Sequence, residues 1–98
     1  MSSHIIQKTY IVQDKGICGG QPRVAGTRIK VQYIALEYER LGWSADRISD
    51  AHPGLTLAQV HAAMSYYYDH REEIDESIRK DEEFADRLKN EQRYLSNV

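Results

Sequence analysis

Cysteine and histidine are the residues of this 98-residue chain whose types could support nucleophilic or metal chemistry. Cys18 is the only cysteine, so the chain forms no internal disulfide and no cysteine-rich zinc site. A thiolate nucleophile needs a base, and no sequence signature places His52, His61 or His70 near Cys18. The nine-residue spacing of these histidines does not match a tetrahedral metal site either. The sequence therefore predicts a protein that is not an enzyme, with no cofactor, no metal and no small-molecule substrate.

A glycine-rich segment from Gly16 to Ile29 is the next candidate for chemistry. Four of the six glycines lie between Gly16 and Gly26, and apolar residues alternate with them. This pattern indicates a backbone path fixed by turns rather than a flexible linker. A phosphate-binding loop would enter its helix through Gly-Lys-Ser/Thr, whereas Gly26-Thr27-Arg28 lacks that lysine. A structural turn is the favoured interpretation.

Charge is distributed unevenly along a chain whose net charge is −2. Residues 1–70 carry seven Lys/Arg and six Asp/Glu, whereas residues 71–98 carry six and nine. No apolar run approaches the length of a membrane span, and the N-terminus has no apolar signal region. These features predict a cytoplasmic protein without a membrane partner, with a slightly basic front part and an acidic tail.

Three segments are predicted within one domain: a β hairpin with the glycine-rich loop (residues 1–30), a three-helix core (31–70) and a C-terminal helical arm (71–98). The hairpin strands are expected over His4–Gln13 and Arg23–Ile29 because β-branched residues dominate there. The first helix is expected to run from Val31 to Gly42, and its apolar residues recur at helical spacing: Val31, Ile34, Ala35, Tyr38 and Leu41.

Capping signals mark the next two helices. Ser44 is a good N-cap, and Trp43 and Ile48 form a hydrophobic staple around it. His52-Pro53-Gly54 ends that helix, and Thr56 to Gln59 forms a capping box that opens the third helix. A second staple pairs Leu55 with Val60, and the core face of the third helix is expected to hold Leu57, Val60, Ala63, Met64 and Tyr67. Two capped helices joined by a short turn predict a helix-turn-helix.

The arm is expected to be a helix from Arg71 to about Tyr94 with a narrow apolar stripe. The stripe comprises Ile74, Ile78, Ala85 and Leu88, flanked by Phe84 and Leu95, and Asp81 interrupts it. Tyr66-Tyr67-Tyr68 diverge by about 100° per residue, so only Tyr67 is expected in the core. Tyr66 and Tyr68 are left to form an interface or to cover the base of the arm. The predicted partner-binding residues are Tyr66, Ile74, Ile78, Phe84 and Leu88.

Nucleic-acid binding is the other interaction to consider. The exposed face of the third helix offers Ala58, Ala62 and Ser65 and no cation, whereas recognition helices usually carry Arg, Lys, Asn or Gln. That small-residue face suits protein contact at least as well as a DNA groove. Cations that could reach phosphates lie elsewhere and include Arg23. The predicted DNA-contacting residues are Arg28, Lys30, Arg47, Thr56, Gln59 and His61.

The glycine-rich segment GICGGQPRVAGTRI resembles the signature of a bacterial family called domain of unknown function 433, whose members look like antitoxins of VapB type. The resemblance extends from about Ile11 to Ile78. It implies a homeodomain-like three-helix bundle, mainly α, and a PIN-like nuclease toxin that the protein neutralises by direct binding. It also implies binding to operator DNA, and we expect a homodimer. The alternatives are a DNA-binding regulator without a toxin, and an oligomerisation module.

Overall fold

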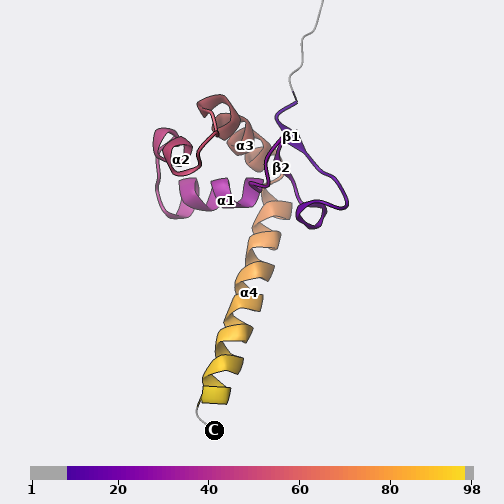
Figure 1. Ribbon diagram of the computed structural model, residues 1–98, viewed down its shortest axis with the longest axis vertical. Coiled ribbons are helices and arrows are strands. Elements are labelled where there is room, and N and C mark those ends of the chain that lie inside the picture. Colours follow the sequence, from indigo (N-terminus) through magenta and orange to yellow (C-terminus); the bar gives the residue numbers. More distant parts are fainter. Residues whose placement is uncertain (1–8, 97–98) are drawn as a thin grey trace, which may run out of the picture.

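The computed structural model describes residues 9–96, which form a small hairpin, a bundle of three helices and one long helix that leaves the bundle (Figure 1). In chain order the elements are β1 (Ile11–Val12), the 3-10 turn η1 (Cys18–Gly20), β2 (Arg23–Val24), α1 (Val31–Ala35), the π turn η2 (Leu36–Arg40), α2 (Ala45–Ala51), α3 (Leu57–Asp69) and α4 (Arg71–Ser96). The mainly helical fold with an N-terminal hairpin and a C-terminal helical arm confirms the predicted class.

One hydrophobic core lies between α1, α2 and α3, and the first two turns of α4 close it. Ile34, Ile48 and Val60 contribute one fully buried side chain from each bundle helix. The other buried apolar residues are Val24, Val31, Ala35, Leu55, Ala63, Met64, Tyr67, Ile74 and Ile78. Apolar residues at helical spacing therefore build the core as the sequence predicts.

The hairpin is shorter than predicted. β1 pairs with β2 in antiparallel register, with Ile11 opposite Val24. The expected first strand covered His4–Gln13, of which residues 4–8 lie outside the described residues. The return strand predicted to reach Ile29 is wrong beyond Val24, because the chain turns at Gly26 (φ +77°) and the Val24 amide donates to the Ile29 carbonyl at 2.9 Å. Positive φ at Gly26 converts the expected strand into a tight turn.

The glycine-rich loop follows a left-handed path. Cys18, Gly19 and Gly20 have φ of +52°, +64° and +78° in succession. Glycine adopts this region without strain, whereas Cys18 is the one non-glycine residue in the described part of the chain with positive φ. Its thiol lies 3.5 Å from the Arg28 carbonyl oxygen, across the loop. The segment is a compact structural turn, as its composition predicts.

The first helix continues into a π turn that the sequence pattern does not reveal. The Leu41 amide donates to the Leu36 carbonyl at 3.1 Å, an i to i+5 bond. The wider turn rotates the following residues relative to α-helical spacing. Tyr38 and Leu41, which the sequence places on the apolar spacing of this helix, are therefore 40% and 61% exposed, and Leu36 packs against the core instead.

The caps of α2 and α3 are formed as predicted. The Ser44 hydroxyl accepts a bond from the Arg47 amide, and Thr56 and Gln59 make the reciprocal bonds of a capping box at 3.1 and 2.8 Å. Leu57 was predicted in the core but is 43% exposed. It occupies the first position of α3, at the rim, and the preceding Leu55 fills the core position.

Two polar contacts join α4 to the first helix. The buried Gln32 side-chain amide donates to the Asp81 carboxylate at 2.6 Å, and Arg40 forms an ion pair with Glu82. Asp81 interrupts the apolar stripe because it accepts this bond at the edge of the bundle. Beyond these contacts α4 projects alone (Figure 1), and every residue from 79 to 93 is exposed.

Candidate functional site

Within the described part of the chain, the residues with catalytic potential do not converge. The His52 Nε2 atom lies 2.5 Å from the Glu37 carboxylate, which joins the end of α2 to η2. The His70 ring stacks on Tyr66 with 4.0 Å between ring centroids. His61 is exposed on α3. Residues 9–96 contain no group of three His, Cys, Asp or Glu side chains that could hold a metal ion.

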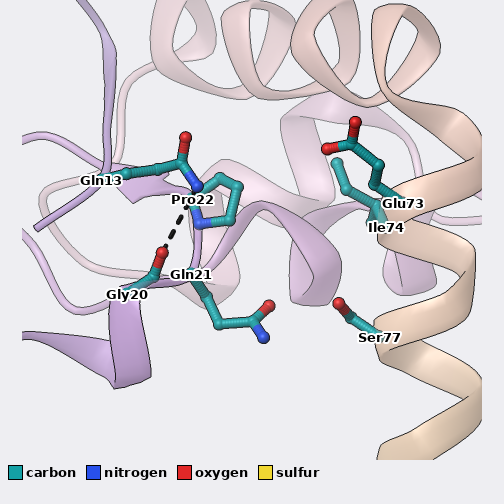
Figure 2. A pocket seen from close by; sticks show the side chains of 7 residues that line it. All are labelled: Gln13, Gly20, Gln21, Pro22, Glu73, Ile74 and Ser77. Atoms are coloured by element: carbon teal, nitrogen blue, oxygen red, sulfur yellow. Dashed lines mark hydrogen bonds between the residues drawn. The ribbon is translucent and has the colours of Figure 1, made fainter. Parts of the chain in front are cut away.

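A small polar recess lies between the glycine-rich loop and α4 (Figure 2). The side chains of Gln21 and Ser77 reach toward it from the loop and from α4, and Gln13 donates to the Gly20 carbonyl at 3.3 Å. Its lining residues are Gln13, Gly20, Gln21, Pro22, Glu73, Ile74 and Ser77, around a volume of about 150 Å³. Ligand pockets usually have about 300–1,000 Å³. This recess is therefore a polar seam that docks the loop onto α4.

Among the predicted phosphate-contacting cations, Arg28 and Arg47 are exposed. The Arg47 guanidinium stacks over the Trp43 ring at 4.3 Å, which holds it beside the start of α2. Lys30 is half-buried, with its ammonium 5.7 Å from the Tyr33 ring. Arg28 and Lys30 lie on the turn before α1, whereas Arg47 lies in the first turn of α2.

Arg23 is not available to a phosphate, contrary to the sequence-based expectation. Its side chain is 9% exposed, and it donates to Asp14 at 2.6 Å and to the Thr27 carbonyl at 3.0 Å. Its Nε atom is buried without a partner. Arg23 is therefore a structural residue that ties the strand β2 to both ends of the glycine-rich turn.

Thr56 and Gln59, two of the predicted DNA-contacting residues, make hydrogen bonds to each other at the start of α3. The Gln59 side-chain oxygen accepts a hydrogen bond from the Thr56 backbone amide in the capping box. Both residues line a recess of about 220 Å³ with hairpin residues that include Tyr10. The hairpin thus lies beside the N-terminus of α3, and only the amide nitrogen of the half-buried Gln59 side chain is left to face a base edge.

The three tyrosines of the run have different environments. Tyr67 is in the core, and its hydroxyl donates to Asp75 of α4 at 2.7 Å. Burial is the main cause that raises the pKa of Tyr67, and the bond to Asp75 raises it further. Tyr66 is half-buried, and its pKa is raised mainly by desolvation. Tyr68 is 49% exposed and donates to Glu39, and this hydrogen bond raises the pKa of Tyr68 to about 12. Tyr67 is therefore the core member, as predicted, whereas Tyr66 packs against the core beside His70 at the start of α4 and Tyr68 is bonded to η2.

The apolar residues expected to bind a partner divide into two groups. Ile74 and Ile78 are each 3% exposed within the protein's own core. Phe84 and Leu88 are 57% and 45% exposed on the free part of α4. We call residues 79–93 of α4 the free arm. Within the set predicted from sequence, only Phe84 and Leu88 offer a large apolar surface to another molecule.

Charged residues on the free arm are held in ion pairs along the helix. Arg79 pairs with both Glu76 and Glu83, and hydrogen bonding from Arg79 lowers the pKa of the Glu76 carboxyl. Such i to i+3 and i to i+4 pairs support a helical segment that has few tertiary contacts. Their side chains remain about half exposed, so another charged surface can compete for them.

Within residues 9–96, no helix has the length and apolar character that a membrane crossing requires.

The sequence did not predict the roles of Gln32, which bonds to Asp81, or of Glu39, which bonds to Tyr68. The interruption of the stripe at Asp81 was the available signal for Gln32, because a polar residue at an apolar position needs a polar partner.

Comparison with known proteins adds family membership to this geometry. The family model described as "Protein of unknown function (DUF433)" matches residues 11–67, which hold the hairpin and the three bundle helices. Comparison with curated proteins gave no significant match. A crystal structure of a DUF433 member from Anabaena variabilis is similar, with 36% sequence identity and a TM-score of 0.64 over 70% of this chain and 67% of that chain. The chain belongs to the DUF433 family.

Proposed function

We propose that this protein is a non-catalytic, cytoplasmic antitoxin whose free arm binds and neutralises a PIN-like nuclease toxin. The observation that carries the proposal is the exposure of Phe84 and Leu88 on a helix that leaves the bundle. An isolated helix of this length is marginal in water, so a partner that buries these side chains would stabilise it. The choice of a PIN-like nuclease as the partner comes from the family resemblance.

Charge supports a basic partner surface. The segment 71–98 carries nine acidic and six basic residues. Glu82 and Glu83 pair with Arg40 and Arg79 at exposed positions, where an ion pair contributes little free energy. Basic side chains around the RNA-binding cleft of a nuclease can therefore replace these intramolecular partners. Phe84 and Leu88 would supply the apolar anchors of the interface.

The test is growth rescue of cells that co-express a candidate PIN-like nuclease toxin. The double variant Phe84→Ser/Leu88→Ser removes both anchors, and the control Asn90→Ser/Arg93→Ser changes two exposed residues on the opposite side of the helix. We expect the control to rescue growth and the double variant to fail. Trp43 fluorescence reports whether the bundle of each variant is folded. Neutralisation by the double variant at the wild-type level contradicts the proposal.

A chain that ends after Glu83 gives a second test. It retains the contacts of Asp81 and Glu82 with the bundle and removes only the distal arm. We expect it to fold and not to neutralise the nuclease. Neutralisation by this shortened chain would place the inhibitory surface on the bundle.

Operator binding is a second candidate function, favoured by the capped α2–α3 pair with the exposed Arg47 at its start. Few cations surround this unit, so we propose modest and salt-sensitive DNA binding with about three or four phosphate contacts per protomer. Arg28→Ala/Lys30→Ala should weaken binding to all DNA sequences alike in a gel-shift titration. The absence of a shift at low salt would leave the helix-turn-helix as a scaffold only.

A further inference from the structure

We propose that this protein forms a domain-swapped dimer, in which α4 of each copy packs on the bundle of the other copy. The hinge of the exchange is His70, the single residue between α3 and α4. Its φ of −128° and ψ of 34° turn the chain there, so α4 leaves the end of α3 in a new direction (Figure 1). The inference concerns this chain by itself and does not rest on the proposed function.

The sequence contains no helix breaker at this hinge. Residues 55–98 include neither glycine nor proline, whereas the turn that ends α2 contains both, at Pro53 and Gly54. A histidine is tolerated inside a helix at a lower cost than either of these residues. The His70 ring stacks on Tyr66, and its Nδ1 atom donates to the Tyr66 carbonyl at 3.0 Å. The bend therefore depends on this ring and on the packing of α4, and not on the backbone of a glycine or proline.

Backbone hydrogen bonds at the hinge already match those of a continuous helix. The His70 amide donates to the Tyr66 carbonyl at 3.0 Å, and the Ile74 amide donates to the His70 carbonyl at 3.1 Å, both with i to i−4 spacing. The amides of residues 71–73 begin α4, and the first turn of a helix has no acceptors within that helix. In a continuous helix the carbonyls of residues 67–69 would accept hydrogen bonds from these amides. Straightening the hinge therefore provides new backbone acceptors.

A second copy can reproduce every contact that holds α4 on the bundle. Ile74 and Ile78 are buried in the core. The polar contacts of α4 with other elements are Tyr67 with Asp75, Gln32 with Asp81 and Arg40 with Glu82. Each of them joins α4 to α1, η2 or α3, so an identical α4 from a second copy makes the same contact. The exchange of identical elements is the reason that domain swapping is a low-cost route to a dimer.

Two straight helices satisfy both bundles at once. In a symmetric dimer the continuous helices, residues 57–96 of each copy, cross near His70. Opposite angles at a crossing are equal, so each α4 meets the α3 of the other copy at the angle that the two helices make within one chain. The free arms still project from the bundles, because the exchanged contacts involve only residues 74–82. The swap therefore leaves Phe84 and Leu88 exposed.

Size-exclusion chromatography with light scattering, after refolding from urea, tests the hinge. We expect the dimer fraction to rise from a few micromolar to hundreds of micromolar chain at refolding, because α4 then meets a second bundle before its own. His70→Ala favours a helical hinge and removes the ring that bonds Tyr66, so its dimer fraction should exceed that of the wild type by at least about threefold. His70→Gly should lower the dimer fraction, because glycine disfavours a continuous helix.

Ser65→Ala is the matched control for the hinge variants. Ser65 is exposed on α3, so alanine there brings a similar gain in helix propensity away from the hinge. We expect it to dimerise like the wild type. The proposal is overturned if His70→Ala forms no more dimer than Ser65→Ala, or if every variant stays monomeric at hundreds of micromolar.

Chemical cross-linking tests whether the dimer is swapped. In a Cys18→Ser background, one chain carries Arg40→Cys and a second carries Glu82→Cys, at the two exposed positions that pair in the structure. After the two chains are refolded together, a short bismaleimide should join them within the dimer fraction. The same chains, refolded separately at a few micromolar and then mixed, should give no cross-linked pair. A dimer without the cross-link is joined through another surface and overturns the proposal, whereas the toxin proposal is decided by the Phe84/Leu88 variants alone.

Discussion

The Gln32 side-chain amide donates a 2.6 Å hydrogen bond to the Asp81 carboxylate, which lies 49 residues further along the chain. Gln32 is 4% exposed, and its side-chain oxygen is buried without a partner. This bond satisfies the other half of a buried amide and fixes where α4 leaves the bundle.

Asp81→Ala should destabilise the fold more than Gln32→Leu. The alanine variant leaves the buried Gln32 amide without an acceptor, at a cost of about 1–3 kcal/mol in the free energy of unfolding. Gln32→Leu removes the whole buried amide, including the unpartnered oxygen, and leaves Asp81 at an exposed position where water can hydrate it. Urea denaturation of both variants measures the difference. Equal costs would show that the hydrogen bond contributes nothing beyond packing.

Arg23→Lys should not preserve stability. The two terminal nitrogens of Arg23 reach Asp14 and the Thr27 carbonyl at once, and a lysine ammonium cannot match that forked geometry. We expect Arg23→Lys to lower the free energy of unfolding by about 1–3 kcal/mol. Arg28→Lys, at an exposed position on the same turn, is the control and should stay within about 0.5 kcal/mol of the wild type in the same urea titration.

Alkaline pH should weaken the fold through Tyr68. Its pKa is raised from 10.0 to about 12 by the hydrogen bond to Glu39, so the folded state holds the phenolic proton more tightly than the unfolded state. This contribution is fully present below pH 10 and is lost as the pH rises toward 12. Thermal unfolding midpoints of the wild type should therefore fall more steeply over this range than those of Tyr68→Phe. Glu39→Gln should show the shallower dependence too.

Leu41→Ser should be nearly neutral, whereas Leu36→Ala should be costly. Leu41 is 61% exposed because the π turn carries it out of the core, so its replacement should change stability by less than about 0.5 kcal/mol. Leu36 packs against the core, so Leu36→Ala should lower the free energy of unfolding by at least about 1 kcal/mol. The reverse order in thermal unfolding would mean that the helix continues as a regular α-helix in solution.

Gln59→Ala should lower stability as well as any DNA affinity. The substitution removes one reciprocal bond of the capping box, which costs about 0.5–2 kcal/mol for a lost cap. DNA binding must therefore be measured well below the unfolding midpoint. If Gln59→Ala loses its preference for particular DNA sequences under those conditions, the Gln59 side-chain nitrogen contacts base edges.

Local chemistry made the caps and the long helices predictable. Ser44 and Thr56 act on amides three residues away, and such contacts are visible in the order of residues. The π turn was not predictable, because apolar spacing alone does not report one extra residue in a turn. The Gln32–Asp81 bond was equally hidden, since it depends on where two distant helices meet. The same distance explains why Ile74 and Ile78 were expected on the surface that binds a partner.

The free arm gives this small protein two levels of resistance to proteolysis. Its backbone hydrogen bonds are covered only by solvated side chains, so it can open locally while the bundle, with its shared core, stays closed. An endoprotease should therefore cut within residues 79–93 first and release a bundle that survives for longer. Any molecule that covers Phe84 and Leu88 would slow that first cut. The lifetime of the intact chain would then report how much of it is bound.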